Sequence, residues 1–372
     1  MSQSPPNKSN RPIIGIALSL VVLNLGVTLA GLWQWLWWMA ALIDFVLLVL
    51  MAEHTGKIIP ARFEGRYERG LAILFPLLLI AGWEAVVAAG ILNPDWFPPP
   101  SKILEALWQL LSGYDRFNKS TLLLRVWMLP QRIAENGLSG AAGLLEESHI
   151  LITLMRVFVG FVIGAIPAIL IGVIMGMSRT VRAMLDSTLS AFYVLPKIAI
   201  FPIMMLVFPN PFGEGPKIAV VAISAFFLVA INTMVGVRDI EPVYLEAGRN
   251  YGANRRQLLR HVIIPGAMPV IFAGLRLALG TALIVIIAIE FVRAKKGVGF
   301  LTFYYWEILA PEKMYAGLIV VMILGVLLTL ALKWLEKRIM PWRREETRTP
   351  SRRTTSRRTA SRRTAPRHRI VE

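Results

Sequence analysis

The sequence predicts an all-α polytopic membrane protein with about eight membrane-spanning helices. Of its 372 residues, 56% are hydrophobic and 17% are charged, and the mean hydropathy is +0.59. An ordinary soluble domain has roughly 45–50% apolar and about 25% charged residues. The apolar residues gather in long blocks, and a bilayer core about 30 Å thick needs roughly 20 such residues per helix. This pattern excludes a typical soluble protein.

The predicted spans are long apolar runs between charged stretches. They cover residues 13–32, 36–51, 71–92, 151–177, 191–208, 218–237, 269–292 and 314–335. The first two form a hairpin in which Asn24 and Asp44 are equally far from Gln34 at the turn, so antiparallel helices place them at similar depth. An ionised carboxylate in lipid costs at least about 2.5 kcal/mol. We therefore expect Asp44 to hydrogen-bond Asn24 or to pair with a cation on a neighbouring helix.

The distribution of basic residues sets the orientation, because cytoplasmic loops of membrane proteins carry the excess of Lys and Arg. With the N-terminus inside, 26 Lys and Arg lie in cytoplasmic segments and ten in outer segments. Both termini are thus predicted to be cytoplasmic. Residues 337–372 hold 13 Lys and Arg against three Glu, which accounts for most of the net charge of +17. The basicity belongs to a tail and does not indicate nucleic-acid binding.

Several kinds of site are missing from the sequence. It has no cysteine and only four scattered histidines, so no metal or thiol site is expected. It also lacks the Gly-x-x-x-x-Gly-Lys-Ser/Thr phosphate loop, so ATP and Mg²⁺ would have to be bound by another chain. The chain by itself is therefore not predicted to be an enzyme.

The predicted domains follow the spans and the charge pattern. They are a cytoplasmic N-terminus (1–12), an extra hairpin with a cytoplasmic loop (13–70), a main membrane domain (71–342) and a disordered basic tail (343–372) with Ser-Arg-Arg-Thr repeats. Within the main domain, 93–150 forms an outer loop that begins with an amphipathic helix over 101–111 and carries an insertion around 114–144. In the span 151–177, small residues recur every four positions, which favours close approach of another helix, either as static packing or as a sliding face. They are Gly160, Gly164, Ala168, Gly172 and Gly176.

The most informative stretch is the cytoplasmic loop 242–265. Residues 244–250 can form one short helix, and Gly252 permits a sharp bend because glycine readily adopts positive φ. Residues 253–261 are predicted to form a second short helix that ends before Pro265. The loop therefore reads as a helix-turn-helix on the cytoplasmic face, with a surface of small residues that another protein could approach: Ala247, Gly248 and Ala253.

This loop resembles the coupling motif of the permease subunits of bacterial ABC importers, which docks into a groove on the ATPase subunit. The matching positions are Glu246, Ala247, Gly252 and Pro265, with Gly248 in place of the third Ala of the motif and Val262 and Ile264 in place of Ile and Leu. The flanks resemble the subfamily that imports nitrate, bicarbonate, taurine and alkanesulfonates, at 83–84, 97–101, 154–157, 195–196, 232–233, 236–238, 274–276, 278–280, Glu290 and 297–300.

The resemblance implies a type I ABC importer transmembrane domain, with a six-helix core that follows the extra hairpin in the sequence. It implies two ATPase subunits, a second permease subunit and a periplasmic or lipid-anchored binding protein. We expect the two permease subunits to form a homodimer, and the sequence leaves a heterodimer of two different permease subunits open. It places the chain in the bacterial inner membrane as a multi-pass protein. Transport would proceed by alternating access, with the energy supplied by the separate ATPase.

Cations inside membrane spans are costly enough to indicate function. The candidate path residues are Lys197, Arg276, Arg156, Glu290, Pro196 and Pro202. Lys197 follows Pro196 in a span interrupted by prolines, and is our main candidate for a substrate contact. Arg156 and Arg276 are expected either to contact substrate or to pair with Glu84 or Glu290. A weakly cationic path suits a small anionic solute such as nitrate, bicarbonate, taurine or a sulfonate.

Two other function classes are weighed against this one. Gly137-Leu138-Ser139-Gly140 matches a short pattern of intramembrane serine proteases, but the Ser is predicted in a polar loop without a membrane-embedded histidine as its base. An ATP-independent secondary transporter or channel is the other alternative. Co-purification of an ATPase with the chain would distinguish the importer from this alternative. The sequence does not identify the exact substrate or the role of the hairpin, the insertion and the tail.

Overall fold

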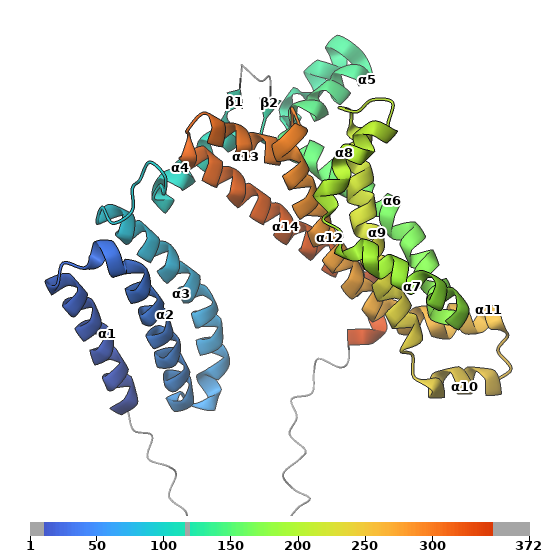
Figure 1. The fold of residues 1–372 in the computed structure, drawn as a ribbon, viewed down its shortest axis with the longest axis horizontal. Helices are drawn as coiled ribbons and strands as arrows, with labels where there is room; N and C mark the ends of the chain where they lie inside the picture. Colours follow the sequence, from blue (N-terminus) through green and yellow to red (C-terminus); the bar gives the residue numbers. More distant parts are fainter. Residues whose placement is uncertain (1–10, 116–119, 345–372) are drawn as a thin grey trace, which may run out of the picture. The chain divides into compact units, whose positions relative to one another are not determined.

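The structure, a computed structural model, describes residues 11–115 and 120–344 and is almost entirely helical (Figure 1). The helices are α1 (Arg11–Leu29), α2 (Trp33–Ile58), α3 (Ala61–Ala88), α4 (Pro100–Ser112), α5 (Leu129–Glu147), α6 (His149–Met177), α7 (Arg179–Val194), α8 (Lys197–Val207), α9 (Glu214–Arg238), α10 (Pro242–Asn250), α11 (Arg255–Leu258), α12 (Ile264–Arg293), α13 (Val298–Glu307) and α14 (Pro311–Ile339). The short helical turns are η1 (Val126–Met128), η2 (Leu259–Ile263) and η3 (Pro341–Arg344), and the antiparallel strands are β1 (Tyr114–Asp115) and β2 (Ser120–Thr121).

Within the described residues, seven helices are long and apolar enough to cross a membrane, and a bent pair brings the number to eight if it is one span. The pair is α7 and α8, which meet at an angle of 100°. The prediction of one helix over 191–208 is therefore wrong. Leu195 precedes a proline, whose ring disfavours helical backbone in the residue before it, and it adopts ψ 135°. The chain turns there and α8 starts directly after Pro196.

The chain divides into two compact units. Unit 1 holds the residues up to Leu151 together with Lys296–Val320, and unit 2 holds Ile152–Lys295 together with the residues from Val321 on. The predicted tail from residue 345 on lies outside the described residues.

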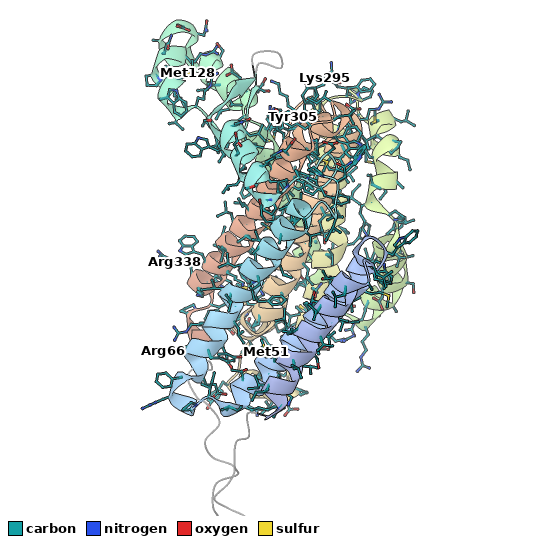
Figure 2. The ribbon with its side chains drawn as sticks, turned by 90° about the vertical axis from the view of Figure 1, so that its left-hand side faces the viewer. Met51, Arg66, Met128, Lys295, Tyr305 and Arg338 are labelled. Atoms are coloured by element: carbon teal, nitrogen blue, oxygen red, sulfur yellow. The ribbon has the colours of Figure 1, made fainter. Side chains whose placement is uncertain are left out.

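In unit 1, α1 and α2 form the predicted N-terminal hairpin. The Asn24 amide donates to both carboxylate oxygens of Asp44 at 3.0 Å, so the predicted pairing is confirmed. The stretch 52–70, predicted as a loop, is instead mostly helical, because α2 and α3 extend past their apolar runs until Pro60 separates them. Figure 2 shows side chains projecting outward along this part, down to Arg66 near the start of α3.

The predicted amphipathic helix is confirmed as α4, which buries one face through Ile103, Ala106 and Leu110. Glu84 in α3 fixes its start, because the carboxylate accepts hydrogen bonds from the backbone N–H of Ser101 at 3.0 Å and from its hydroxyl at 2.8 Å.

The insertion forms the β1–β2 ribbon, η1 and the helix α5, which the sequence did not predict. Arg125 and Arg132 both donate to Glu147, each at 2.9 Å, and tie the middle of the insertion to the end of α5. Ser139 lies within α5, so the prediction of a loop serine is wrong. Gly137, with φ 61°, kinks α5, and Ser139 lies in the helical half that follows this kink.

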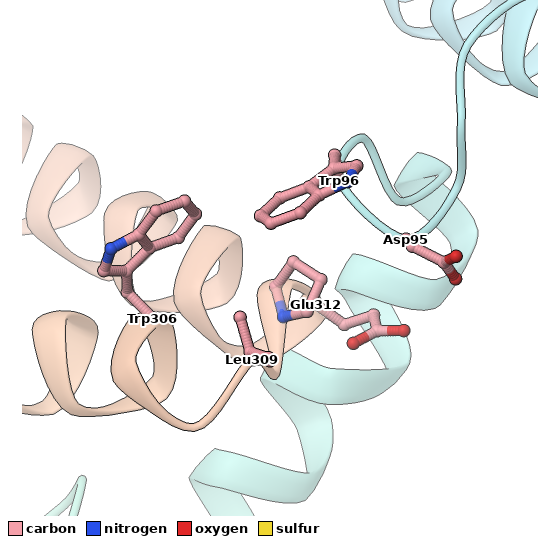
Figure 3. A pocket seen from close by; sticks show the side chains of 6 residues that line it. Asp95, Trp96, Trp306, Leu309 and Glu312 are labelled. Atoms are coloured by element: carbon pink, nitrogen blue, oxygen red, sulfur yellow. The ribbon is translucent and has the colours of Figure 1, made fainter.

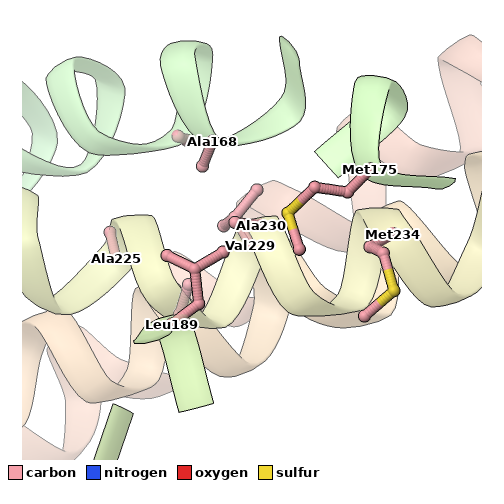
Figure 4. Close-up of a cluster of buried hydrophobic side chains, with 9 residues drawn as sticks. Ala168, Met175, Leu189, Ala225, Val229, Ala230 and Met234 are labelled. Carbon is pink, nitrogen blue, oxygen red and sulfur yellow. The ribbon is translucent and has the colours of Figure 1, made fainter. Parts of the chain in front are cut away.

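Unit 2 is built on close packing of α6 against α9. A Cβ atom added at Gly164 would lie 2.2 Å from the carbonyl oxygen of Ala222, and one at Gly172 would lie 2.6 Å from Cβ of Thr233. No side chain fits into such gaps, so the repeated small residues allow this contact within the chain. A cluster of small and flexible apolar side chains fills the centre, including Ala168, Met175, Ala225, Ala230 and Met234 (Figure 4).

Candidate functional site

The loop between α9 and α12 is a compact helix-turn-helix. Pro242 begins α10, where its missing N–H is not needed, and Gly252 makes the turn with φ 78°. The Asn254 side chain accepts from the backbone N–H of Gln257 at 2.9 Å, and the Gln257 side chain accepts from that of Asn254 at 2.8 Å. This capping box starts α11 immediately after the turn. The predicted bend at Gly252 thus has the backbone that favours glycine.

The inner side of this element is packed and its outer side is open. Leu258 is buried in a cluster with Val237, Ile263 and Ala267, and Leu245 of α10 packs against this cluster. Gly248 faces Leu258, whose Cδ1 would lie 2.7 Å from an added Cβ. The other motif residues Glu246 and Ala247 are exposed, Ala253 is half-buried, and Tyr251 at the tip is 93% exposed. The element therefore presents a firmly held tip to its surroundings.

The second half of the loop differs from the prediction of a short helix that ends before Pro265. Here α11 passes through the π-helical turn η2 into α12, and the helical run extends from Arg255 to Arg293. A proline lacks its N–H and clashes with the carbonyl four residues before it, here that of His261. The wider π turn contains that residue and accommodates the proline, so the helix continues.

At the entrance to the loop, Arg238 donates to Asp239 at 2.7 Å. This hydrogen bond lowers the pKa of the Asp239 carboxyl.

A second site is a group of charges where α6, α9 and α12 meet, buried except for Glu214, whose side chain is 43% exposed. Arg156 is 2% exposed and donates to Glu214 and, at 2.6 Å, to the fully buried Glu290. Lys217 donates to Glu214 at 3.0 Å, and the Thr153 hydroxyl donates to Glu290 at 3.0 Å. Two cations and two carboxylates balance, so the cluster joins three helices without net charge.

Of the predicted partners, Glu290 does pair with Arg156, whereas Glu214 and Lys217 were not predicted. Their sequence signal was present, since both flank the start of an apolar block three residues apart. Arg276 in α12 pairs with Glu336 in α14, so the predicted pairing with Glu84 or Glu290 is wrong for this residue. Arg276 pairs with a carboxylate on the helix next to it, which is α14. Glu84 instead accepts hydrogen bonds from Ser101 at the start of α4.

Lys197 lies at the first turn of α8, directly after the break at Pro196. Its ammonium donates to the carbonyl oxygen of Tyr193 and lies 4.8 Å from the centroid of the Tyr193 ring. Because the chain bends here, the Tyr193 carbonyl has no N–H donor from the next helical turn. The lysine ammonium takes the place of that donor. Pro202 lies inside α8. The predicted role of these residues in a translocation path stays a prediction.

Comparison with known proteins decides the family. Residues 168–341 match the family described as "Binding-protein-dependent transport system inner membrane component". The taurine transport system permease protein TauC of Escherichia coli is 31% identical over 268 residues, which are 72% of this chain and 88% of that protein. This chain belongs to that permease family.

Other similar proteins are known. The nitrate import permease protein NrtB of Synechococcus elongatus is 29% identical over 255 residues, which are 65% of the permease described here and 88% of NrtB. Among solved structures, a chain of the MetNI methionine ABC transporter in an inward-facing conformation is 22% identical. It covers 50% of this permease and 92% of its own length, with a TM-score of 0.44.

The predicted family and the predicted fold class, a helical importer transmembrane domain, are both confirmed. The permease is a multi-pass inner-membrane protein and a transport component, not an enzyme. This leaves no role for the serine pattern in α5, where the exposed Ser139 hydroxyl donates to the carbonyl oxygen of Asn136 at 2.6 Å.

Proposed function

We propose that this permease imports a small anionic solute, of the nitrate, bicarbonate, taurine or sulfonate kind, by alternating access. A separate ATPase subunit binds ATP and Mg²⁺ and docks on the α10–α11 element. The observation that carries this proposal is that element itself, with its inner side packed on Leu258 and its tip at Tyr251 exposed.

The fold of the element supports force transfer and not only docking. A flexible loop would absorb a push from the ATPase, whereas α11 continues through η2 into α12 as one helical run. A displacement of the tip is therefore carried into the membrane part of unit 2.

The remaining partners follow from the family. A permease of a binding-protein-dependent system works with an external binding protein, and we propose that a second copy of this chain completes the pore. Both chain termini and the α10–α11 element then lie on the cytoplasmic side, in accordance with the excess of Lys and Arg in those segments.

The substrate class is supported by two observations. The similar permeases are named for taurine and nitrate, both of which carry an oxyanion. In this chain Lys197 adds a cation at the α7–α8 break, and a single cation can attract an anion without holding it too tightly for release.

The coupling role is tested with two glycine substitutions in the same loop. Gly252→Val forces a β-branched residue into φ 78°, so the turn should distort and uptake should fall at least tenfold while membrane insertion persists. Gly248→Ala is the matched control, because its Cβ would lie 2.7 Å from the flexible end of Leu258, which can move, and 3.6 Å from Cγ2 of Val262, and because it restores the family motif. Uptake and ATPase activity are measured in proteoliposomes with the cognate ATPase. Normal ATP-dependent uptake by Gly252→Val would remove the coupling assignment.

The substrate class is tested separately. Lys197→Ala should lower uptake of the anion several-fold and leave basal ATPase activity nearly unchanged, since the hydrogen bond of Lys197 is to Tyr193 in its own bend and not to the α10–α11 element. Ligand binding is measured on the cognate binding protein by calorimetry with taurine, nitrate and a sugar that carries no oxyanion group. A binding protein that takes only ligands without an oxyanion group would overturn the anion class and leave the permease role standing.

The stand-alone transporter remains the competing function. An ATPase that stays bound to the permease through detergent purification supports the importer. Active uptake by the isolated chain without ATP would favour the alternative.

A further inference from the structure

A pocket of about 310 Å³ lies in unit 1, where the connection between α3 and α4 meets the turn between α13 and α14 (Figure 3). It is lined by Asp95, Trp96, Trp306, Leu309, Pro311 and Glu312. The function proposed above uses none of these residues.

The two turns that form the pocket are fixed by their own hydrogen bonds. The backbone N–H of Asp95 donates to the Asn93 side chain at 2.9 Å, and that of Trp96 donates to the Asn93 carbonyl at 3.2 Å. Across the pocket, Leu309 has φ 54°, and its N–H donates to the Trp306 carbonyl at 3.1 Å. A leucine in the left-handed region is strained, and such strain persists where the surroundings determine the conformation. The walls are therefore set before any ligand arrives.

The lining has the chemistry of a cation site. The rings of Trp96 and Trp306 are 5.9 Å apart between centroids, and both side chains are about half exposed. Indole faces attract cations, and this attraction grows as the cation loses water. Asp95 and Glu312 add two carboxylates, which Figure 3 shows on the same side of Trp96. Within the described residues, neither carboxylate takes part in a salt bridge.

This chemistry repels the anionic solutes proposed as substrate, so the pocket serves another ligand. Its apolar walls, Leu309, Pro311 and the two indoles, suit the methylene stem of a Lys or Arg side chain, and the carboxylates suit its charged head. Glu307, Glu312 and Lys313 crowd the same turn, and such a density of charge belongs in water and not in the lipid core. The pocket thus opens to the aqueous phase at the side predicted to be outside.

We infer that this pocket receives a Lys or Arg side chain of the external binding protein and positions that protein on the permease. The inference rests on the proposed import function, which supplies the partner. Charge complementarity identifies the occupant. The carboxylates of Asp95 and Glu312 attract a cation, and a Lys or Arg side chain on a protein that docks on this face has both that charge and an apolar stem.

The test measures binding of the purified, substrate-loaded cognate binding protein to the permease–ATPase complex in nanodiscs of phosphatidylglycerol. The double variant Asp95→Asn/Glu312→Gln removes both charges and keeps the side-chain shapes. We expect about a tenfold rise in Kd at low salt, equivalent to about 1.4 kcal/mol, and a smaller rise at high salt. Glu307→Gln is the matched control, an exposed carboxylate of the same turn outside the pocket, and should change Kd less than twofold.

A second measurement identifies the occupant directly. A photo-crosslinking p-benzoylphenylalanine in place of the exposed Leu309 should label the binding protein at a segment that contains Lys or Arg. Crosslinks to lipid in nanodiscs of phosphatidylethanolamine, or a double variant that binds like the wild type, would overturn the inference and leave import intact. Failure of the wild-type complex to bind the binding protein at all would overturn both the inference and the proposed function.

Discussion

Helices α1 and α9 have almost the same mean hydropathy, 2.2 and 2.4, yet differ completely in burial. None of the most apolar stretch of α1 is buried within the structure, whereas half of that of α9 is. Hydropathy therefore identifies helices that belong in a membrane and does not tell which of them pack against protein. Helix burial follows a different sequence signal.

That signal is small residues and charges inside the apolar run. In unit 2, the glycines of α6 lie against α9, and Arg156, Glu214 and Glu290 link α6, α9 and α12. In α1, Gly15 and Gly26 have open space around them, and the Asn24–Asp44 pair is the polar link to α2. The hairpin is thus two lipid-compatible helices joined by a polar pair, and unit 2 is a packed bundle.

The largest effect is expected from breaking the buried charge cluster. Arg156→Met leaves Glu290 fully buried without its arginine, and removing one partner of a buried ion pair costs about 3–5 kcal/mol. We expect loss of folded protein or a large drop in the thermal unfolding temperature in detergent, measured by fluorescence. Arg238→Met, which breaks an exposed pair, is the control and should shift this temperature little. Equal shifts would mean that the cluster contributes no more than a surface pair.

The comparison of glycines is the next test. Gly164→Val would collide with the backbone of α9, and such overpacking costs roughly 1–3 kcal/mol or more. Gly26→Val in α1 meets nothing within 4 Å and should leave stability unchanged within about 0.5 kcal/mol. Both variants are compared by thermal unfolding and by uptake. A stable Gly164→Val would show that α6 and α9 are not in close contact.

A smaller effect is expected in the hairpin. The double variant Asn24→Leu/Asp44→Leu removes the pair without leaving a carboxylate unpaired in the membrane, and side-chain hydrogen bonds between membrane helices average about 0.6 kcal/mol. We expect reduced insertion or stability of the hairpin, measured by protease protection, with the uptake rate per folded molecule retained. Loss of uptake at normal expression would instead assign the hairpin to the transport cycle.

The smallest effect is predicted for removal of residues 345–372. Lys337 and Arg338 remain at the end of α14 and continue to hold its orientation. Uptake should stay within about twofold of the full-length chain. Loss of uptake in an assembled complex would make the tail a regulatory or docking segment.

The sequence predicted the features that arise from local chemistry. The hairpin pair, α4, the bend at Gly252 and seven of the eight spans follow from periodicity, glycine and apolar length. What it missed depends on distant partners. The pairing of Arg276 with Glu336 joins residues 60 positions apart, and no local pattern selects that carboxylate over Glu290.

Two prolines act differently from what the sequence predicts. The sequence predicts Pro196 inside one span, but this proline separates α7 from α8. It predicts that a helix ends before Pro265, but this proline lies inside a continuous helical run. The effect of a proline depends on the backbone before it. The helix continues where the preceding helical turn widens into a π turn, as in η2, and it breaks where the preceding residue is extended, as at Leu195. The residues around a proline alone do not decide between these outcomes.

The continuous helical run from Arg255 to Arg293 has a mechanical consequence. At 1.5 Å per residue its 39 residues measure roughly 58 Å, which is longer than the bilayer core of about 30 Å. It joins Leu258 of the cytoplasmic loop to Glu290 of the buried charge cluster without an intervening loop. In the proposed import cycle, a movement of the ATPase-docking element would therefore reach the charge cluster through helix alone.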